Sequence, residues 1–272
     1  MHLWRKSITE RWLKLHEAWL GHCSPECIAF IRRPGFKRLT IEISAEPAQA
    51  RACKRLHGGT VVRLERDWLA QFAKAQRRKP LAIGQRLVVL DSCEPARAGS
   101  QALVIPSGAA FGTGDHATTA MSLRMLERRS RKLPAGWSLA DLGTGSGILS
   151  LAAARFGGRE IEAIDNDPMA ISTAKENARL NRIRGIRFAV LDVKRWRARR
   201  KVDVVVANLF SQLLIAALPS ITAALKRRGS FIFSGVLRRE EGVVVRAIRK
   251  SGLQLEEIRR RGKWVALAGR GP

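Results

Sequence analysis

The segment ADLGTGSGILSLAA, residues 140–153, decides the fold of this chain because its glycines stand between an apolar run and a helical pattern. Gly143, Gly145 and Gly147 allow a tight turn and let the backbone approach a ligand closely. The residues before them are typical of a buried strand, and 148–156 has the apolar spacing of a helix. We therefore predict a strand–turn–helix unit whose turn contacts a ligand.

An acidic residue, Asp165, ends the next apolar run, 22 residues beyond Gly143. At this spacing a carboxylate can accept both hydroxyl groups of a ribose. Together with the strand–turn–helix context, Asp165 favours a nucleoside ligand over a plain tight turn. The order GxGxG, preceded by Asp141, differs from the six-residue GxGxxG pattern that binds the pyrophosphate of a dinucleotide.

Strands alternate with helices throughout the part of the chain after residue 135. This alternation predicts an α/β fold with a mostly parallel, Rossmann-like sheet and right-handed crossovers. The last two apolar runs have only Gly262 between them, which predicts an antiparallel hairpin at the sheet edge. The predicted strands are 138–142, 160–164, 186–190, 202–207, 230–234, 253–259 and 263–268, and the predicted helices are 148–156, 168–181, 211–227 and 239–251.

The N-terminal part predicts a separate small α+β lobe. Its helix–strand–strand–helix–strand order is compatible with a ferredoxin-like fold if residues near 3–7 supply a first strand. The turn-rich segment DSCEPARAGSQ (91–101) separates this lobe from the rest of the chain. We therefore place a substrate-recognition lobe at 1–90, a linker at 91–110 and a second domain at 111–272. Within the lobe, the predicted helices are 8–20 and 46–56, and the predicted strands are 27–33, 38–44 and 61–64.

The chain is strongly basic, with 50 Lys and Arg residues against 23 Asp and Glu and a net charge of +27. Such a charge attracts nucleic acid and makes binding salt-dependent. The basic residues are spread along the chain, with peaks at 74–79, 194–201 and 258–263, so a general enrichment of arginine on solvated faces is the alternative.

Other classes of protein are disfavoured by composition. No apolar stretch approaches the roughly 18 residues of a membrane span, and the first residues lack the apolar segment of a secretory signal. The four cysteines form no CxxC pair, so we expect no metal site. The sequence predicts a soluble, cytoplasmic protein without membrane contact.

Two further segments narrow the interpretation. FGTGDHATT (111–119) precedes the glycine loop, and ANLF (207–210) ends the fourth strand of the predicted sheet. Together with the glycine loop and AIDNDPMAIS (163–172), they resemble class I S-adenosylmethionine-dependent methyltransferases, and specifically the PrmA family, which methylates large-subunit ribosomal protein eleven. The resemblance runs from about Asp67 to the C-terminus, roughly three quarters of the chain, and includes the closing KWVALAG (263–269).

The resemblance implies that the chain binds S-adenosylmethionine and yields S-adenosylhomocysteine, without a metal. Asp192, after the third strand, stands where this class often contacts adenine, and a helix cap is the alternative. Phe111 would belong to a loop that closes over the donor. The other residues that the resemblance places at the donor are Thr119, Gly143, Gly145, Asp165 and Asn208.

Methyl transfer from a sulfonium is an in-line displacement, so an attacking amine must arrive neutral although a free lysine has a pKa near 10.4. The side-chain carbonyl of Asn208 and the main-chain carbonyl of Leu209 can accept the N–H bonds of the amine and orient it. Phe210 can border a cation through its ring. A structural turn at Asn208 and a core position for Phe210 are the alternatives. His116 is a candidate base or a residue that fixes the loop.

The leading hypothesis is therefore a methyltransferase acting on lysine or N-terminal amines of a ribosomal protein, with ribosomal RNA nearby, and working as a monomer. An rRNA methyltransferase is an alternative that the charge favours. Base-modifying relatives usually carry Asn or Asp followed by Pro-Pro and an aromatic residue, whereas this chain has Asn208-Leu209-Phe210, which favours a protein substrate. An inactive, donor-binding ribosome-assembly factor is the third hypothesis.

Overall fold

The structure is a computed structural model that describes residues 2–20, 27–32, 38–63, 80–91, 101–106 and 116–272. The chain divides into two units, Met1–Arg77 and Arg78–Pro272. The sequence placed this division later, at 91–110. The boundary lies earlier because residues 81–90 form strands whose side chains belong to the core of the second unit.

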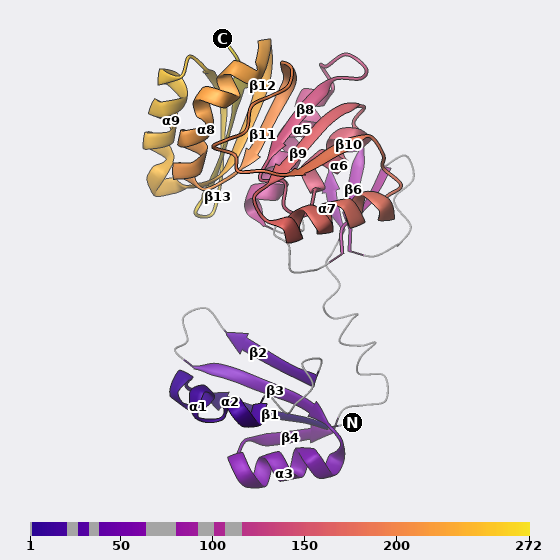
Figure 1. Cartoon of the computed structure of the whole chain (residues 1–272), viewed down its shortest axis with the longest axis vertical. Helices are drawn as coiled ribbons and strands as arrows, with labels where there is room; N and C mark the ends of the chain where they lie inside the picture. Colours follow the sequence, from indigo (N-terminus) through magenta and orange to yellow (C-terminus); the bar gives the residue numbers. More distant parts are fainter. Residues whose placement is uncertain (1, 21–26, 33–37, 64–79, 92–100, 107–115) are drawn as a thin grey trace. The chain divides into compact units, whose positions relative to one another are not determined.

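The first unit contains an antiparallel sheet of four strands in the order β2-β3-β1-β4 (Figure 1). Its described residues also form the helices α1, α2 and α3. The first strand, which the sequence interpretation required near residues 3–7, is present as β1. Every other predicted element of this unit is found within three residues of its predicted ends, except that the first helix is divided into two. The elements are β1 (His2–Ile8), α1 (Glu10–Leu15), α2 (Glu17–Leu20), β2 (Ile28–Arg32), β3 (Leu39–Ala45), α3 (Pro47–His57) and β4 (Thr60–Arg63).

Alternate residues of β1 and β3 build the core of this unit. Trp4 is fully buried, and its indole N–H donates to the carbonyl of Gly58 at 2.7 Å. Trp12 and Trp19 pack against the same core, whereas Leu15 is exposed. The N-terminal tryptophans therefore serve packing within the unit.

The second unit contains a seven-stranded sheet in the order β10-β9-β8-β11-β12-β14-β13 (Figure 1). The first five strands in this order are parallel, and β14 pairs antiparallel with both β12 and β13. This arrangement confirms the Rossmann-like α/β fold and the C-terminal hairpin. The strands are β8 (Ser138–Leu142), β9 (Glu160–Asp165), β10 (Ile186–Val190), β11 (Val202–Asn208), β12 (Leu225–Leu237), β13 (Gln254–Arg261) and β14 (Trp264–Arg270).

Helices cover both faces of this sheet. Helices α5 (Ala117–Ser130) and α6 (Ile148–Arg155) bury apolar side chains in the core on one face, and α8 (Ser211–Ala224) and α9 (Glu241–Lys250) do so on the other. Helix α7 (Pro168–Leu180) begins after Asp167, whose side chain accepts from the Met169 N–H at 2.8 Å. The sequence did not predict α5.

A second, three-stranded sheet extends the core on the face of α5 and α6. Its strands are β5 (Leu81–Ile83), β6 (Leu87–Leu90) and β7 (Gln101–Val104). Leu87 and Leu103 are fully buried in the same cluster as α5 and α6. No helix among the described residues is long and apolar enough to cross a membrane.

Candidate functional site

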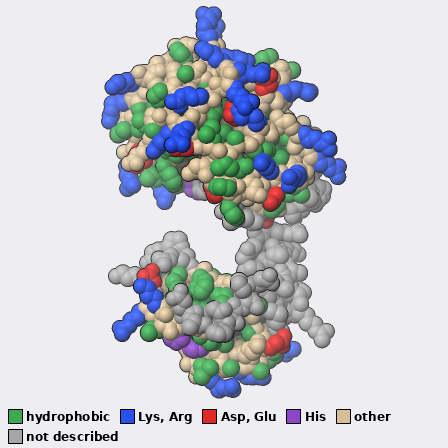
Figure 2. Space-filling model, viewed as in Figure 1, with side chains coloured by type: hydrophobic (Ala, Val, Ile, Leu, Met, Phe, Trp, Pro, Cys, Tyr) green, Lys and Arg blue, Asp and Glu red, His purple; other side chains and the backbone are tan. Residues whose placement is uncertain are grey.

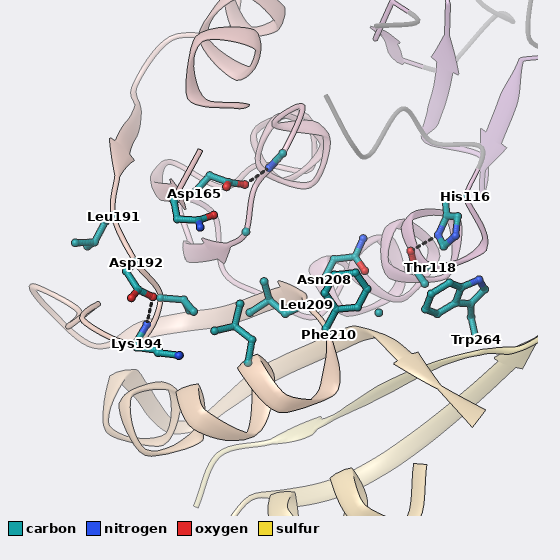
Figure 3. Close-up of a pocket in the computed structure, with 16 residues that line it drawn as sticks. His116, Thr118, Asp165, Leu191, Asp192, Lys194, Asn208, Leu209, Phe210 and Trp264 are labelled. Atoms are coloured by element: carbon teal, nitrogen blue, oxygen red, sulfur yellow. Dashed lines mark hydrogen bonds between the residues drawn. The ribbon is translucent and has the colours of Figure 1, made fainter. Parts of the chain in front are cut away.

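A pocket of about 800 Å³ opens where the parallel strands of the second unit end (Figure 3). The carboxyl ends of parallel strands share one edge of a sheet, so side chains far apart in sequence meet there. Seven of the predicted site residues line the pocket, namely Gly143, Gly145, Asp165, Asp192, Asn208, Leu209 and Phe210. The predicted residue Phe111 lies outside the described residues.

The glycine loop between β8 and α6 has a backbone conformation that only glycine adopts without strain. Gly143, Gly145 and Gly147 all have positive φ values, of 75°, 54° and 82°. A Cβ atom on Gly143 would lie 2.5 Å from Cδ2 of Leu209. The N–H groups of Gly143 and Thr144 both donate to the carbonyl of Ile164 at 2.9 Å, which holds the loop against β9.

Asp165 ends β9 beside this loop, as the sequence predicted. Its Oδ2 accepts from the Gly145 N–H at 2.9 Å, and its Oδ1 accepts from the Asp167 N–H at 3.1 Å. A carboxylate offers about four lone-pair sites. The two backbone bonds therefore fix the carboxylate and leave it able to accept from hydroxyl groups in the pocket.

Asp192 lines the pocket after β10, together with Leu191 and Val193. Its Oδ1 also accepts from the Lys194 N–H at 2.9 Å. Asp192 therefore lines the pocket as the sequence predicted, and its bond to Lys194 closes a turn at 193–195; it does not cap a helix, because no helix lies between β10 and β11.

The Asn208-Leu209-Phe210 turn joins β11 to α8, and all three residues line the pocket. The Oδ1 atom of Asn208 is buried and has no hydrogen-bond partner among the described residues. The Leu209 N–H donates to the carbonyl of Ser234 at 3.0 Å. Phe210 is 76% exposed, which excludes the core position considered for it.

Gly235 makes room for this turn. Its φ is 84°, and a Cβ atom there would lie 2.5 Å from the carbonyl oxygen of Leu209. The β12 backbone can therefore approach Leu209 closely only because residue 235 is glycine.

Helix α5 brings a third group of residues to the site. The His116 Nδ1 and the Thr118 Oγ1 form a hydrogen bond of 2.7 Å, and the His116 ring lies edge-on to Trp264, 4.9 Å between centroids (Figure 3). Burial, and then the charge of Lys263, lower the pKa of His116 below 6.5. Thr119 is fully buried but does not line the pocket, and its Oγ1 has no partner among the described residues.

Asp141 lies beneath the glycine loop and is fully buried. Its Oδ2 accepts from the hydroxyls of Thr144 and Ser150, both at 2.7 Å. Burial raises its pKa from 3.8 to about 6, although these two hydrogen bonds oppose the shift. Its Oδ1 has no partner among the described residues.

Sequence reasoning missed Gly235, Leu213 and Trp264 as pocket residues. Trp264 lies within the closing KWVALAG segment, so a motif that carried the family resemblance pointed to it. The position of Gly235 had no local signal, because it depends on the pairing of β12 with β11.

The PrmA family of ribosomal protein L11 methyltransferases matches residues 37–271. The chain belongs to the PrmA family. The matched region confirms the resemblance drawn from the motifs and begins earlier, at residue 37 rather than near Asp67.

Curated relatives of this PrmA-family chain are named ribosomal protein L11 methyltransferase. The protein from Pelotomaculum thermopropionicum is 40% identical over 208 residues, which cover 76% of this chain and 66% of that protein. The one from Symbiobacterium thermophilum is 37% identical over 211 residues, covering 76% and 67%. The chain thus spans about two thirds of the length of the curated relatives it matches.

Solved structures give the same fold. The ribosomal protein L11 methylase of Lactobacillus delbrueckii subsp. bulgaricus aligns with a TM-score of 0.65 and 27% identity, covering 72% of this PrmA-family chain and all of that structure. An S-adenosylmethionine-dependent methyltransferase from Clostridium acetobutylicum aligns with a TM-score of 0.50 and 13% identity, over 58% of this chain and 93% of that one. The second similarity shows the class I methyltransferase fold alone.

Proposed function

We propose that this chain transfers methyl groups from S-adenosylmethionine to lysine or N-terminal amines of a ribosomal protein, large-subunit protein L11. The observation that carries the proposal is the meeting, in one pocket, of the Gly143 loop and Asp165 with the carbonyl oxygen of Asn208, to which no described residue donates a hydrogen bond. The first two suit a nucleoside, and the third suits an N–H donor. Family membership over residues 37–271 supports the same reaction.

The lining of the pocket suits S-adenosylmethionine in its hydrogen-bonding capacity. Asp165 would accept from the ribose hydroxyls, and Leu191, Asp192 and Val193 would border the adenine. Buried acceptors without partners are rare in proteins, so the Oδ1 atom of Asn208, which lines the pocket and has no partner among the described residues, favours a ligand that brings N–H or O–H groups. When bound, the donor supplies an electrophilic methyl group on its sulfonium.

The chain itself would orient the acceptor amine. The Asn208 Oδ1 and the Leu209 carbonyl can each accept one N–H bond, which aims the nitrogen lone pair at the methyl group. Positioning of this kind can contribute about 7–11 kcal/mol to catalysis. Phe210 and Trp264 border the same space and suit a cationic group through their rings.

His116 is our candidate for the proton acceptor. Because its pKa is lowered, its ring is mostly neutral at pH 7 and can accept a proton. Its bond to Thr118 would also fix the ring at the pocket edge.

We assign substrate presentation to the first unit, now bounded at Arg77 rather than at residue 90. The motifs of the donor site all lie in the second unit, so the first unit is available for recognising a protein. We further propose that the protein acts as a monomer in the cytoplasm, where ribosomal proteins are made, and that ribosomal RNA lies nearby during the reaction.

The test is to incubate the chain with radiolabelled S-adenosylmethionine and unmodified ribosomes, and to separate protein L11, the other proteins and the RNA. We expect label in L11. Label in RNA alone would support rRNA methylation instead, and donor binding without any label would support the inactive assembly factor.

A further inference from the structure

A basic groove runs along the edge of the seven-stranded sheet opposite to the methyl-transfer pocket. Three pockets open there, among the first residues of β8, β9, β10 and β11 and the segments that precede these strands. Arg159 lines all three pockets, Gly157 lines two of them, and Gly185 joins the third to its neighbour. The pockets are therefore adjacent, and we name them together the basic groove.

The basic groove carries an excess of positive charge. Eight arginines and two glutamates line it, and the glutamates, Glu160 and Glu162, already form ion pairs with Arg200 and Arg187. A further three arginines of the groove are exposed and form no ion pair with any described residue: Arg159, Arg184 and Arg199. These three guanidinium groups are available to an external anion.

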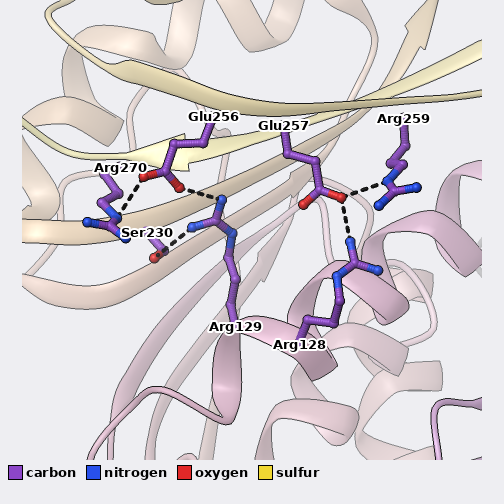
Figure 4. A network of polar contacts seen from close by, with 7 residues as sticks. All are labelled: Arg128, Arg129, Ser230, Glu256, Glu257, Arg259 and Arg270. Atoms are coloured by element: carbon purple, nitrogen blue, oxygen red, sulfur yellow. Dashed lines mark hydrogen bonds and ion pairs between the residues drawn. The ribbon is translucent and has the colours of Figure 1, made fainter.

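Arginines at the other end of the same sheet form ion pairs with two glutamates. Arg128 and Arg259 pair with Glu257, at 2.6 and 2.7 Å (Figure 4). Arg129 and Arg270 pair with Glu256, at 2.9 and 2.8 Å. Lysine and arginine side chains are spread over the visible face of the second unit (Figure 2), so basic residues alone do not distinguish the groove. Exposed arginines without an ion pair also occur elsewhere among the described residues, for example Arg246 and Arg249 on α9. The groove differs because its unpaired arginines line adjacent pockets.

The geometry of the groove suits phosphate groups. Arg159, Arg184 and Arg199 precede β9, β10 and β11, which lie in the sheet in the order β10-β9-β8-β11. Neighbouring strands lie about 4.8 Å apart, so the starts of β9 and β10 lie within a Debye length of about 8 Å, and the start of β11 lies two strand spacings from that of β9. The planar guanidinium binds phosphate through two parallel hydrogen bonds. A row of phosphates therefore gains from several of these arginines at once.

The remaining lining residues narrow the type of polyanion. Two aromatic residues line the groove, Trp137 and Phe156, and they are only 2% and 5% exposed. None of the exposed large hydrophobic side chains of the described residues lines it. Binding of single strands commonly uses exposed aromatic rings for base stacking, and membrane insertion needs exposed apolar groups. A double helix needs neither.

We propose that the basic groove binds the sugar-phosphate backbone of double-stranded RNA. The parallel strands separate the groove from the methyl-transfer pocket by roughly 17 Å, the length of a five-residue strand. The protein can therefore hold RNA at one edge of the sheet while the other edge stays open to a protein substrate. The choice of RNA over DNA rests on the proposed ribosomal function. The inference that the groove binds a double helix does not depend on that function.

The test compares two triple variants that remove the same charge. The groove variant carries Arg159→Gln, Arg184→Gln and Arg199→Gln. The control variant carries Arg246→Gln, Arg249→Gln and Lys250→Gln, which are exposed on α9 against the opposite end of the sheet. The probes are a fluorescent RNA duplex of about 16 base pairs, and a DNA duplex of the same sequence, each titrated between low and high salt.

We expect the RNA affinity of the groove variant to fall at least about tenfold, and the salt slope to fall by about two to three, near one for each phosphate that the variant no longer neutralises. The control variant should bind nearly as the unchanged protein does. An equal loss in both variants, or no loss in either, would overturn the proposal, and tighter binding of DNA than of RNA would overturn the choice of RNA. Donor affinity and methyl transfer to free L11, measured in parallel, should not change in the groove variant. If the protein binds RNA in this way but methylates nothing, the proposed function is refuted and the proposal of RNA binding stands.

Discussion

The buried carboxyl of Asp141 should make the stability of the second unit depend on pH. Its Oδ2 is held by the hydroxyls of Thr144 and Ser150, but no described group donates to its Oδ1. Burial therefore disfavours the ionised form and raises the pKa to about 6. Asp141→Asn keeps the shape of the side chain and an oxygen for the two hydroxyls, while it removes the charge.

The size of the effect follows from the shift of the pKa from 3.8 to about 6. Two pKa units correspond to about 3 kcal/mol. Because the folded state holds the proton more tightly than the unfolded state, the ionised carboxylate destabilises the fold above pH 6, and the penalty disappears as the pH falls through 6 towards 4. Between pH 4 and 6.5 the unchanged protein should lose about 2 kcal/mol relative to Asp141→Asn.

The assay is urea denaturation of both proteins at several pH values, which gives the free energy of unfolding of each. The difference between the two proteins removes the contribution of all other titrating groups. The new amide has no acceptor for its N–H groups among the described residues, which shifts the difference by a constant and does not alter its slope. A difference that stays flat between pH 4 and 6.5 would refute a raised pKa for Asp141.

Four further outcomes are expected. Asp165→Ala should weaken S-adenosylmethionine binding by about 1.5–3 kcal/mol in calorimetry, whereas Asp167→Ala, which removes only the cap of α7, should leave the donor Kd unchanged. Asn208→Ala should lower kcat far more than donor affinity, and near-normal turnover would make the turn purely structural. Gly235→Ala should also lower kcat, because its Cβ atom would displace the Leu209 carbonyl. The control is Gly252→Ala: residue 252 has a similar φ of 82° and no neighbour within 4 Å, so this change should lower stability but not turnover. A truncated chain of residues 78–272 should keep donor binding and lose methylation of L11; equal methylation would remove the recognition role of the first unit.

Elements with strong local patterns were predictable from the sequence. The strands at 138–142 and 186–190 coincide with their predicted ends, because a buried parallel strand between two helices is a short apolar run with clear boundaries. Helix α5 was missed because its first turn, with the buried Thr118 and Thr119, belongs to the polar FGTGDHATT segment and was interpreted as a loop.

Features that depend on distant pairing were not predictable. Strand β6 has only four residues, and its parallel partner β7 follows it in the sequence after residues 92–100. No local pattern of apolar residues therefore assigns β6 to the second unit. This is the reason that the predicted boundary fell too late, and that a truncation starting near residue 95 would remove part of the core. At the site, the glycine loop and Asp165 were predictable because the spacing of one strand–turn–helix unit sets both. Trp264 reaches the pocket because β14 inserts between β12 and β13.

The central claim is that the Asn208-Leu209 turn directs a protein amine to the methyl donor. Its most direct test is mass spectrometry of purified, unmethylated L11 after incubation with S-adenosylmethionine and either the unchanged protein or Asn208→Ala. The account predicts methyl groups on lysine or N-terminal amines of L11 with the unchanged protein, and a strongly reduced rate with the variant at saturating donor. Unmodified L11 in both reactions, or equal rates in both, would contradict it.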